Sequence, residues 1–167
     1  MTIADTDEAL QNLTRCLQEI LSTRAIQSPV MLGIHTGGAW VASHLQQAID
    51  NQMPLGSLDI SFYRDDFSRV GMNPEVRPSH IPFDVENRHI ILVDDVLYTG
   101  RTIRAALNEI FAYGRPASVI LAVLIERDGR QLPIAADCTG ARAELSDHQQ
   151  VKLSGPEPLA LEVIEVG

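Results

Sequence analysis

Two adjacent aspartates, Asp94 and Asp95, follow a run of apolar residues, and a Thr-Gly-Arg-Thr segment starts four positions after the second aspartate. An apolar run of leucine and β-branched residues that ends at a turn predicts a buried β-strand. The segment Thr102–Tyr113 has the apolar spacing of an amphipathic helix. The residues therefore predict a strand, a turn of the size of a phosphate group, and the N-terminus of a helix.

This turn is suited to bind an anion. Glycine lets the chain approach a ligand closely, and the dipole of the following helix favours negative charge at its N-terminus. The backbone N–H groups expected to point into the turn are those of Tyr98, Thr99, Gly100, Arg101 and Thr102. The carboxylates before the turn only accept hydrogen bonds, so they suit hydroxyl groups or a metal-bound pyrophosphate. A ribose 5-phosphate that carries a pyrophosphate, bound with Mg²⁺, has this layout.

The segment Val93–Thr102, VDDVLYTGRT, resembles the phosphoribosyl-pyrophosphate (PRPP) binding motif of the type I phosphoribosyltransferases. Two flanking blocks narrow the resemblance: YRDD within Ser61–Asp66, and GRP…LAVLIERDGRQLPI within Gly114–Ile134. With these blocks the chain is similar to the bifunctional pyrimidine operon regulator/uracil phosphoribosyltransferase family, PyrR. The likeness extends from about the first predicted helix to the last predicted strand.

The aspartate pair has two other interpretations. An apolar strand that ends in aspartates also occurs in P-loop nucleotidases, but that fold requires G-x-x-x-x-G-K-[ST]. The only lysine here is Lys152, in QVKLSG, which excludes a P-loop. The second alternative is a solvated strand end followed by a capped helix. It stays open, although Tyr-Thr-Gly-Arg-Thr offers more anion-binding backbone than a helix cap requires.

The resemblance implies an α/β protein with the type I phosphoribosyltransferase fold, in which helices flank a central, mainly parallel sheet and a flexible hood loop covers the substrate. It implies a uracil phosphoribosyltransferase of pyrimidine salvage, which converts uracil and PRPP into UMP and diphosphate with Mg²⁺ as cofactor. The expected catalytic residues are Asp94, Asp95 and Arg64, and the aspartates are expected to act on the metal through water or the ribose. The expected ribose and phosphate contacts are Asp94, Asp95, Val96, Leu97, Tyr98, Thr99, Gly100, Arg101 and Thr102.

The loop after the predicted strand Val30–Ile34 is similar to the loop that binds pyrophosphate through backbone N–H groups in PRPP enzymes, often with unusual peptide geometry. It consists of His35, Thr36, Gly37 and Gly38. The PyrR pattern here is Thr-Arg-Gly, and Gly37 stands where arginine is expected. This removes a cation from a site of concentrated negative charge, so either Mg²⁺ and backbone donors suffice, or His35 and Arg64 partly compensate. A strand-end histidine without a ligand remains the alternative for His35.

A long polar segment, Tyr63–Phe83, begins at the end of the next predicted strand and holds several prolines and three arginines. A structureless loop of this length inside a compact domain is unusual unless it has a function. The resemblance implies that Asp65–Phe83 is a flexible hood, which closes over the substrate and keeps water from the reacting ribose. Arg64, Arg69 and Arg77 are the candidate phosphate partners there, and a solvated arginine is an equally good interpretation of each.

The segment Glu126–Arg130, after the predicted strand Ser118–Glu126, lies near the base pocket by resemblance. Backbone groups there would read the edge of uracil, with Arg127 at the border, and a surface turn of mixed charge is the alternative. In purine enzymes of the superfamily an aspartate commonly precedes the Thr-Gly of the motif. Tyr98 occupies that position here, which favours a pyrimidine as the base.

Alternating apolar patterns predict a single domain, residues 1–167, built on a parallel sheet with right-handed crossovers. The chain ends in short strands, notably Leu159–Val166, which would complete a sheet edge or a small accessory lobe. The predicted helices are Asp7–Arg24, Gly38–Ala48 and Thr102–Tyr113, and the main predicted strands are Val30–Ile34, Leu58–Arg64, His89–Val93 and Ser118–Glu126. Cys16 and Cys138 are predicted to be reduced packing residues, because they form no metal-ligand or CxxC pattern.

The net charge of −9 and the 13 Lys+Arg residues limit nucleic-acid binding, because RNA phosphates require clustered cations. An RNA-binding attenuator of the pyrimidine operon, responsive to UMP and specific for an mRNA leader, is therefore the alternative function. Its candidate cations are Arg15, Arg24, Arg142 and Lys152. No leader peptide or membrane span is evident, so a cytoplasmic protein is expected, and we expect a homo-oligomer, a dimer or larger.

Overall fold

A computed structural model describes residues 5–60 and 79–166 of the 167-residue chain. Its central sheet has five strands, all parallel: β1 (Val30–Ile34), β2 (Leu55–Leu58), β3 (His89–Leu97), β4 (Ser118–Arg127) and β5 (Cys138–Ala143). Their order across the sheet is β2-β1-β3-β4-β5. All five residues of β1 are buried, as expected for a strand that is covered on both faces of a parallel sheet.

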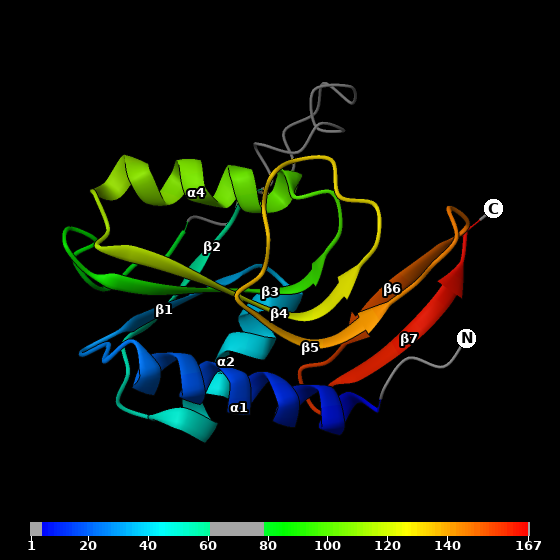
Figure 1. The fold of residues 1–167 in the computed structure, drawn as a ribbon, viewed down its shortest axis with the longest axis horizontal. Coiled ribbons are helices and arrows are strands. Elements are labelled where there is room, and N and C mark those ends of the chain that lie inside the picture. Colours follow the sequence, from blue (N-terminus) through cyan, green and yellow to red (C-terminus); the bar gives the residue numbers. More distant parts are fainter. Residues whose placement is uncertain (1–4, 61–78, 167) are drawn as a thin grey trace.

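Three helices cover the two faces of the sheet (Figure 1): α1 (Thr6–Thr23) and α2 (Gly37–Ile49) on one face, and α4 (Arg101–Tyr113) on the other. One hydrophobic core lies under α1 and α2 and includes Leu13, Leu17 and Leu45. A second core lies under α4 and includes Ile103 and Ile110. The sheet is thus the middle layer of three, and its strand ends remain available for a site.

The first helix packs closely on the last strand of the sheet. A Cβ atom on Gly140 of β5 would lie 2.6 Å from the backbone oxygen of Ala9, so glycine allows the two backbones to meet. The side chain of Asn12 donates a hydrogen bond of 3.3 Å to the Gly140 carbonyl. This contact joins residues that are far apart in the sequence.

A separate antiparallel hairpin stands beside the sheet (Figure 1) and consists of β6 (Gln149–Ser154) and β7 (Ala160–Glu165). Its second strand is attached to the start of α1, because the Leu161 N–H donates to Thr6 Oγ1 at 3.0 Å. The hairpin is the small accessory lobe that the terminal sequence suggested as one of two outcomes. Within residues 5–60 and 79–166, no helix has the length and apolar content to cross a membrane.

Most predicted elements are confirmed, and β1 has the predicted bounds. The prediction of a strand at Leu58–Arg64 was wrong where the structure describes it, since β2 ends at Leu58. There the chain leaves the sheet and the Asp59 N–H donates to Ser79 Oγ at 3.1 Å. The remainder of that predicted strand, the hood loop up to residue 78, and the candidates Arg64, Arg69 and Arg77 lie outside the described residues.

Candidate active site

The strands β1 and β3 are neighbours at the centre of the sheet, and the helices that follow them diverge. After β1 the chain passes through α2 to β2 on one side, whereas after β3 it passes through α4 to β4 on the other. In open α/β sheets, ligands bind outside the carboxyl ends of the strands at such a switch point. The predicted pyrophosphate loop and the predicted phosphate loop both leave the sheet here.

The two aspartates lie inside β3, which corrects the predicted end of this strand at Val93. Asp94 is 5% exposed, and its Oδ1 accepts a 2.9 Å hydrogen bond from the backbone N–H of Asp95. Asp95 is half-buried, and its Oδ1 accepts a 2.8 Å bond from the N–H of Val96. These local bonds fix the orientation of both carboxyl groups at the switch point.

The loop of His35, Thr36, Gly37 and Gly38 lies directly against these aspartates. A Cβ atom on Gly37 would collide with the carboxylate of Asp95, and one on Gly38 would lie 2.6 Å from the Val93 carbonyl oxygen. The peptide between His35 and Thr36 is cis, in line with the expected unusual peptide geometry. The structure thus brings together the two segments that the motifs predicted as partners, although they are far apart in the sequence.

The phosphate loop, Tyr98–Gly100, connects β3 to α4. Gly100 has φ +96°, a left-handed conformation that favours glycine, and it is the N-cap of α4. The carbonyl of Thr99 accepts hydrogen bonds from the N–H groups of Gln131 at 3.0 Å and Leu132 at 3.2 Å. The loop is therefore held in shape by the segment that follows β4.

Other predicted contacts in this motif differ in what they offer a ligand. Val96 packs against the core under α1 and α2, and Leu97 is 2% exposed within the core under α4. The N–H of Arg101, expected to face an anion, donates to Thr99 Oγ1 at 3.2 Å. Thr102 is half-buried in the first turn of α4.

Two helices at this edge begin without a cap bond from their N-cap side chains, although Thr99 Oγ1 accepts from the first N–H of α4. Neither Thr36 at the start of α2 nor Gly100 at the start of α4 makes a side-chain cap bond, whereas Asp5 caps α1 by accepting from the Asp7 N–H at 2.8 Å. The first N–H groups of a helix have no partner within it, and the helix dipole favours anions there. The site therefore has two helix N-termini whose dipoles favour negative charge, near the two carboxylates of β3.

A cavity of about 640 Å³ opens beside the phosphate loop, at the carboxyl ends of β3, β4 and β5. Its walls include Tyr98 and Arg127, and the guanidinium carbon of Arg127 lies 3.9 Å from the centroid of the Tyr98 ring. Arg127 is 8% exposed, and its Nε has no hydrogen-bond partner among the described residues. Arg127 thus lines the cavity, but its Nε is buried away from the open space.

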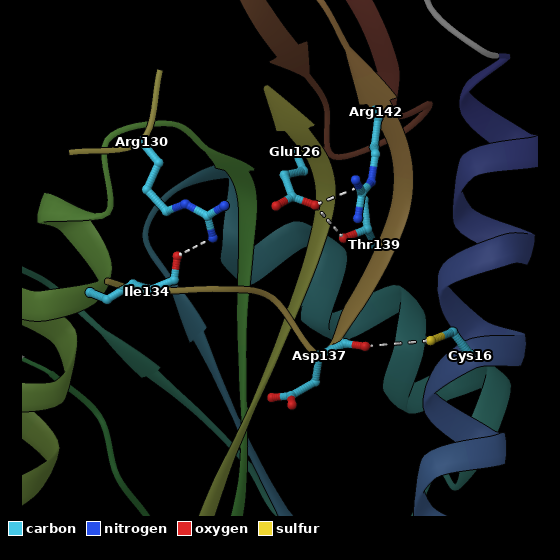
Figure 2. A network of polar contacts seen from close by, with 7 residues as sticks. All are labelled: Cys16, Glu126, Arg130, Ile134, Asp137, Thr139 and Arg142. Carbon is cyan, nitrogen blue, oxygen red and sulfur yellow. Dashed lines mark hydrogen bonds and ion pairs between the residues drawn. The ribbon is translucent and has the colours of Figure 1, made fainter. Parts of the chain in front are cut away.

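The charged residues around this cavity are held by local contacts. Figure 2 shows Glu126 between two partners: it accepts from Thr139 Oγ1 at 3.2 Å and pairs with Arg142 Nε at 3.5 Å. Arg130 donates to the Ile134 carbonyl at 3.0 Å (Figure 2). The carboxylate of Asp128 accepts from the Leu145 N–H at 3.1 Å. These contacts anchor the walls of the cavity to β5 and to the segment before the hairpin.

Several residues of the site were not found by sequence reasoning. The bonds from Gln131 and Leu132 to Thr99, and the stacking of Arg127 on Tyr98, connect segments with no periodic pattern to mark them. The sequence GRQLPI contains Gln131 and Leu132, but the sequence alone marks it only as a block similar to the PyrR family. That two N–H groups of this block donate to the Thr99 carbonyl is visible only in the structure.

The family model for the phosphoribosyl transferase domain matches residues 2–155. Among solved structures, a hypoxanthine-guanine phosphoribosyltransferase from Bacillus anthracis has a TM-score of 0.67 at 15% identity, over 89% of this chain and 85% of that one. A purine phosphoribosyltransferase from Pyrococcus horikoshii has a TM-score of 0.63 at 25% identity, over 86% and 85%. The fold is therefore that of the type I phosphoribosyltransferases.

Similar sequences narrow the class. The bifunctional protein PyrR of Nitrosococcus oceani is 57% identical over 159 residues, which cover 94% of this chain and 90% of the relative. The bifunctional protein PyrR of Pseudomonas savastanoi pv. phaseolicola is 52% identical over 163 residues, or 98% and 96% of the two chains. The chain belongs to the phosphoribosyl transferase family and, within it, to the PyrR family.

Proposed function

We propose that the chain, residues 1–167 as one phosphoribosyltransferase domain, transfers the phosphoribosyl group of PRPP to uracil and releases UMP and diphosphate. The observation that carries this proposal is the position of Asp94 and Asp95 at the switch point of the sheet, where the start of α2 lies against both aspartates and the turn after β3 leads into α4. PRPP has a phosphate at one end, a diphosphate near the other and ribose hydroxyls between them. The helix N-termini would donate to the phosphate and the diphosphate of PRPP, and the two carboxylates would accept from its ribose hydroxyls.

In this reaction uracil N1 forms a bond to C1 of the ribose as the bond from C1 to the diphosphate oxygen breaks. The N1 proton is released as this bond forms, and among the described residues no side chain of the site stands out as a general base for it. The start of α4, with Tyr98–Thr102, would bind the 5-phosphate, and Asp94 and Asp95 would bind the ribose hydroxyls. The loop from His35 to Gly38 would bind the diphosphate as charge develops on it.

The acidic pair also fits Mg²⁺. Magnesium is commonly bound by one or two carboxylates, with water and substrate phosphates as its other ligands. Asp94 and Asp95 supply the two carboxylates, and no cluster of three or more His, Cys, Asp or Glu side chains occurs within the described ranges. When bound, the ion would neutralise charge on the leaving diphosphate. Arg64, outside the described residues, is the proposed additional cation of the site.

The cavity beside Tyr98 is proposed as the uracil pocket. Arg127 lies at its border, and the backbone of the Glu126–Arg130 segment, which lines the cavity, would contact the edge of the base. Tyr98 stands where the purine enzymes commonly have an aspartate. The tyrosine at this position supports a pyrimidine as the substrate.

A product assay tests this proposal. The protein is incubated with PRPP, Mg²⁺ and one nucleobase at a time, and nucleotides are separated by chromatography. We expect UMP from uracil to form faster than any purine nucleotide, and at least about a hundredfold less UMP with the Asp95→Asn variant as a control. Faster turnover of hypoxanthine or guanine than of uracil would show that the base assignment is wrong.

RNA-dependent regulation is the second candidate function, and the name bifunctional protein PyrR of its relatives supports it. Two of the four candidate cations are already in ion pairs: Arg24 with Asp137 and Arg142 with Glu126, each at 3.5 Å. Arg15 and Lys152 are exposed. We rank this function second, because a phosphate-binding patch would have to be assembled across a homo-oligomer from few cations.

A further inference from the structure

Arg127, the last residue of β4, is a buried cation with an unusual set of partners. Its guanidinium donates to the backbone carbonyl of Gln149 at 3.0 Å and to that of Ser146 at 3.5 Å. The same group stacks on the ring of Tyr98. A buried charge needs such partners, because removing it from water is otherwise costly. Arg127 therefore joins two parts of the molecule that do not share a strand.

The first part is the accessory hairpin. Gln149 begins β6, and its N–H donates to the Ser146 carbonyl at 3.1 Å, while its side-chain Oε1 accepts from the Ser146 N–H at 3.1 Å. The His148 carbonyl accepts from the Val166 N–H at 2.6 Å. The two carbonyls that hold Arg127 thus belong to a closed turn, which is fixed to both ends of the hairpin.

The second part is the phosphate loop, which begins at Tyr98. Although the Tyr98 side chain is 41% exposed, its ring is held by Arg127 and by the backbone of Gly129. A Cβ atom on Gly129 would collide with the ring, and the φ of +114° at this residue also favours glycine. The ring is thus fixed by contacts with β4 and the segment after it.

We propose that Arg127 is a positioning residue: it connects the β6–β7 hairpin to the phosphate loop and holds that loop in the conformation that binds a sugar phosphate. The inference depends on the proposed function only for the identity of that ligand. The proposed role goes beyond a place at the border of the uracil pocket. The two bonds to carbonyls and the stacking on Tyr98 connect parts of the protein and require no bound base. Arginine suits this role, since its planar group can stack and donate in several directions at once.

The first arm of the test requires no ligand. Hydrogen exchange is followed at Gln131 and Leu132, whose N–H groups report on the phosphate loop through Thr99, and at Gln149 and Val166, which report on the hairpin. Arg127→Met keeps an apolar stem but removes the charge and the donors. We expect exchange to rise by about tenfold or more at both pairs of reporters. A rise at the hairpin reporters alone would overturn the inference.

The matched control is Arg88→Met. Arg88 also donates a guanidinium hydrogen bond to a backbone carbonyl, that of Ser28 at 3.3 Å, but it directly precedes β3 at the amino end of the sheet. We expect the four reporters to exchange in this variant as they do in the wild type. An equal rise in both variants would indicate general destabilisation and would contradict a specific connection.

The second arm measures binding of ribose 5-phosphate by calorimetry, because this ligand has no base and cannot contact a uracil pocket. Arg127→Met and Tyr98→Leu should each weaken binding by about tenfold, and the double variant should bind no more weakly than either single variant. Additive losses, or unchanged binding in Arg127→Met, would contradict the inference. Failure of the wild type to bind ribose 5-phosphate would count against the proposed function instead, and the exchange arm would still decide the connection.

A third variant guards against loss of folding in Arg127→Met. Because coupling between two sites is reciprocal, Tyr98→Leu should raise exchange at Gln149 and Val166 of the hairpin even though Tyr98 does not belong to it. The exposed Tyr98 ring contributes little to the core, so this variant should fold. Wild-type exchange at both hairpin reporters in Tyr98→Leu would show that Arg127 does not transmit between the two parts.

Discussion

The backbone of Gly37 lies directly against the carboxylate of Asp95, so that a side chain at position 37 would collide with that carboxylate. The contact joins the first turn of α2 to β3 across the switch point of the sheet. It gives a physical reason for the departure from the Thr-Arg-Gly pattern of PyrR: this arrangement of Asp95 leaves no space for an arginine. Under the proposed function, the backbone N–H groups of the loop would then bind the diphosphate.

Restoring the arginine is therefore expected to impair the protein. Gly37→Arg and Gly37→Ala should both displace Asp95 and raise the KM for PRPP by about tenfold or more, in line with overpacking costs of about 1–3 kcal/mol. Steady-state kinetics with Ser43→Ala, on the exposed side of the same helix, provide the control. A lower KM in Gly37→Arg would mean that the loop adapts and that the missing cation limits affinity.

The two aspartates should differ in what their loss costs. Asp95→Asn should reduce turnover by about a hundredfold or more with little change in melting temperature, because the lost contact is to the substrate. Asp94 is buried and accepts the Asp95 N–H, so Asp94→Ala should also lower the free energy of unfolding by about 1–3 kcal/mol. Turnover and urea denaturation are measured on each variant. An active Asp95→Asn enzyme would leave a solvated strand end as the better interpretation.

The two cysteines should react differently with a thiol reagent. Burial, together with a hydrogen bond to Cys16, raises the pKa of the Cys138 thiol, whereas Cys16 is half-buried. The thiolate is the reactive form, so Ellman's reagent should modify Cys16 first and Cys138 only after unfolding. Cys16→Ser is the matched variant, and it should leave no fast-reacting thiol. Equal rates for both thiols in the native protein would contradict this assignment.

The same raised pKa makes stability depend on pH. Above about pH 8.5 an unfolded chain releases the Cys138 proton, while the folded protein retains it. The contribution to the free energy of unfolding is therefore complete below that pH and decreases as the pH rises towards the folded-state pKa of Cys138. Denaturation curves from neutral to alkaline pH should show this loss, and Cys138→Ala should reduce it. A pH profile that is identical in Cys138→Ala would exclude this thiol as the cause.

RNA binding provides the test between the two candidate functions. With Arg24 and Arg142 paired to carboxylates, the protein should bind generic RNA no more tightly than about 10⁻⁴ to 10⁻⁶ M at physiological salt. Filter binding to the leader transcript of the pyrimidine operon, with UMP present, measures specific binding. Nanomolar affinity that strengthens at low salt and is lost in Arg15→Glu, but not in Arg115→Glu at the start of the α4–β4 connection, would reverse our ranking.

The sequence predicted the elements best where burial alone decides them. The bounds of β1 follow from five successive buried residues between Pro29 and His35. The end of β3 was missed because Asp94 and Asp95 interrupt the apolar pattern, while pairing with β4 continues through Val96↔Ile125 and Leu97↔Glu126. Backbone pairing does not depend on side-chain polarity. A strand that ends in a site therefore extends beyond its hydrophobic signal.

The candidate site, like the fold, has features that the sequence could predict and features that it could not. Its anion-binding turns were predictable from local features, namely glycines and helix starts next to strand ends. The contacts of Thr99 with Gln131 and of Tyr98 with Arg127 were not, because they depend on the adjacency of β3 and β4 and on a turn before the hairpin. Such contacts between loops leave no periodic mark in either segment. The reason for glycine at position 37 likewise required the position of the Asp95 carboxylate.

The packing of α1 on β5 has a consequence for folding during synthesis on the ribosome. The first helix to be synthesised finds its partner, the backbone at Gly140, only when most of the chain has been made. Likewise β1 can pair with β3, its neighbour at the centre of the sheet, only after β3 has left the ribosome. Contacts between such distant residues form slowly and leave apolar surface uncovered in the meantime. A nascent chain that stalls before β5 would therefore expose the apolar face of its first helix. We expect folding to depend most on uninterrupted translation, or on chaperones, while the last third of the chain is synthesised.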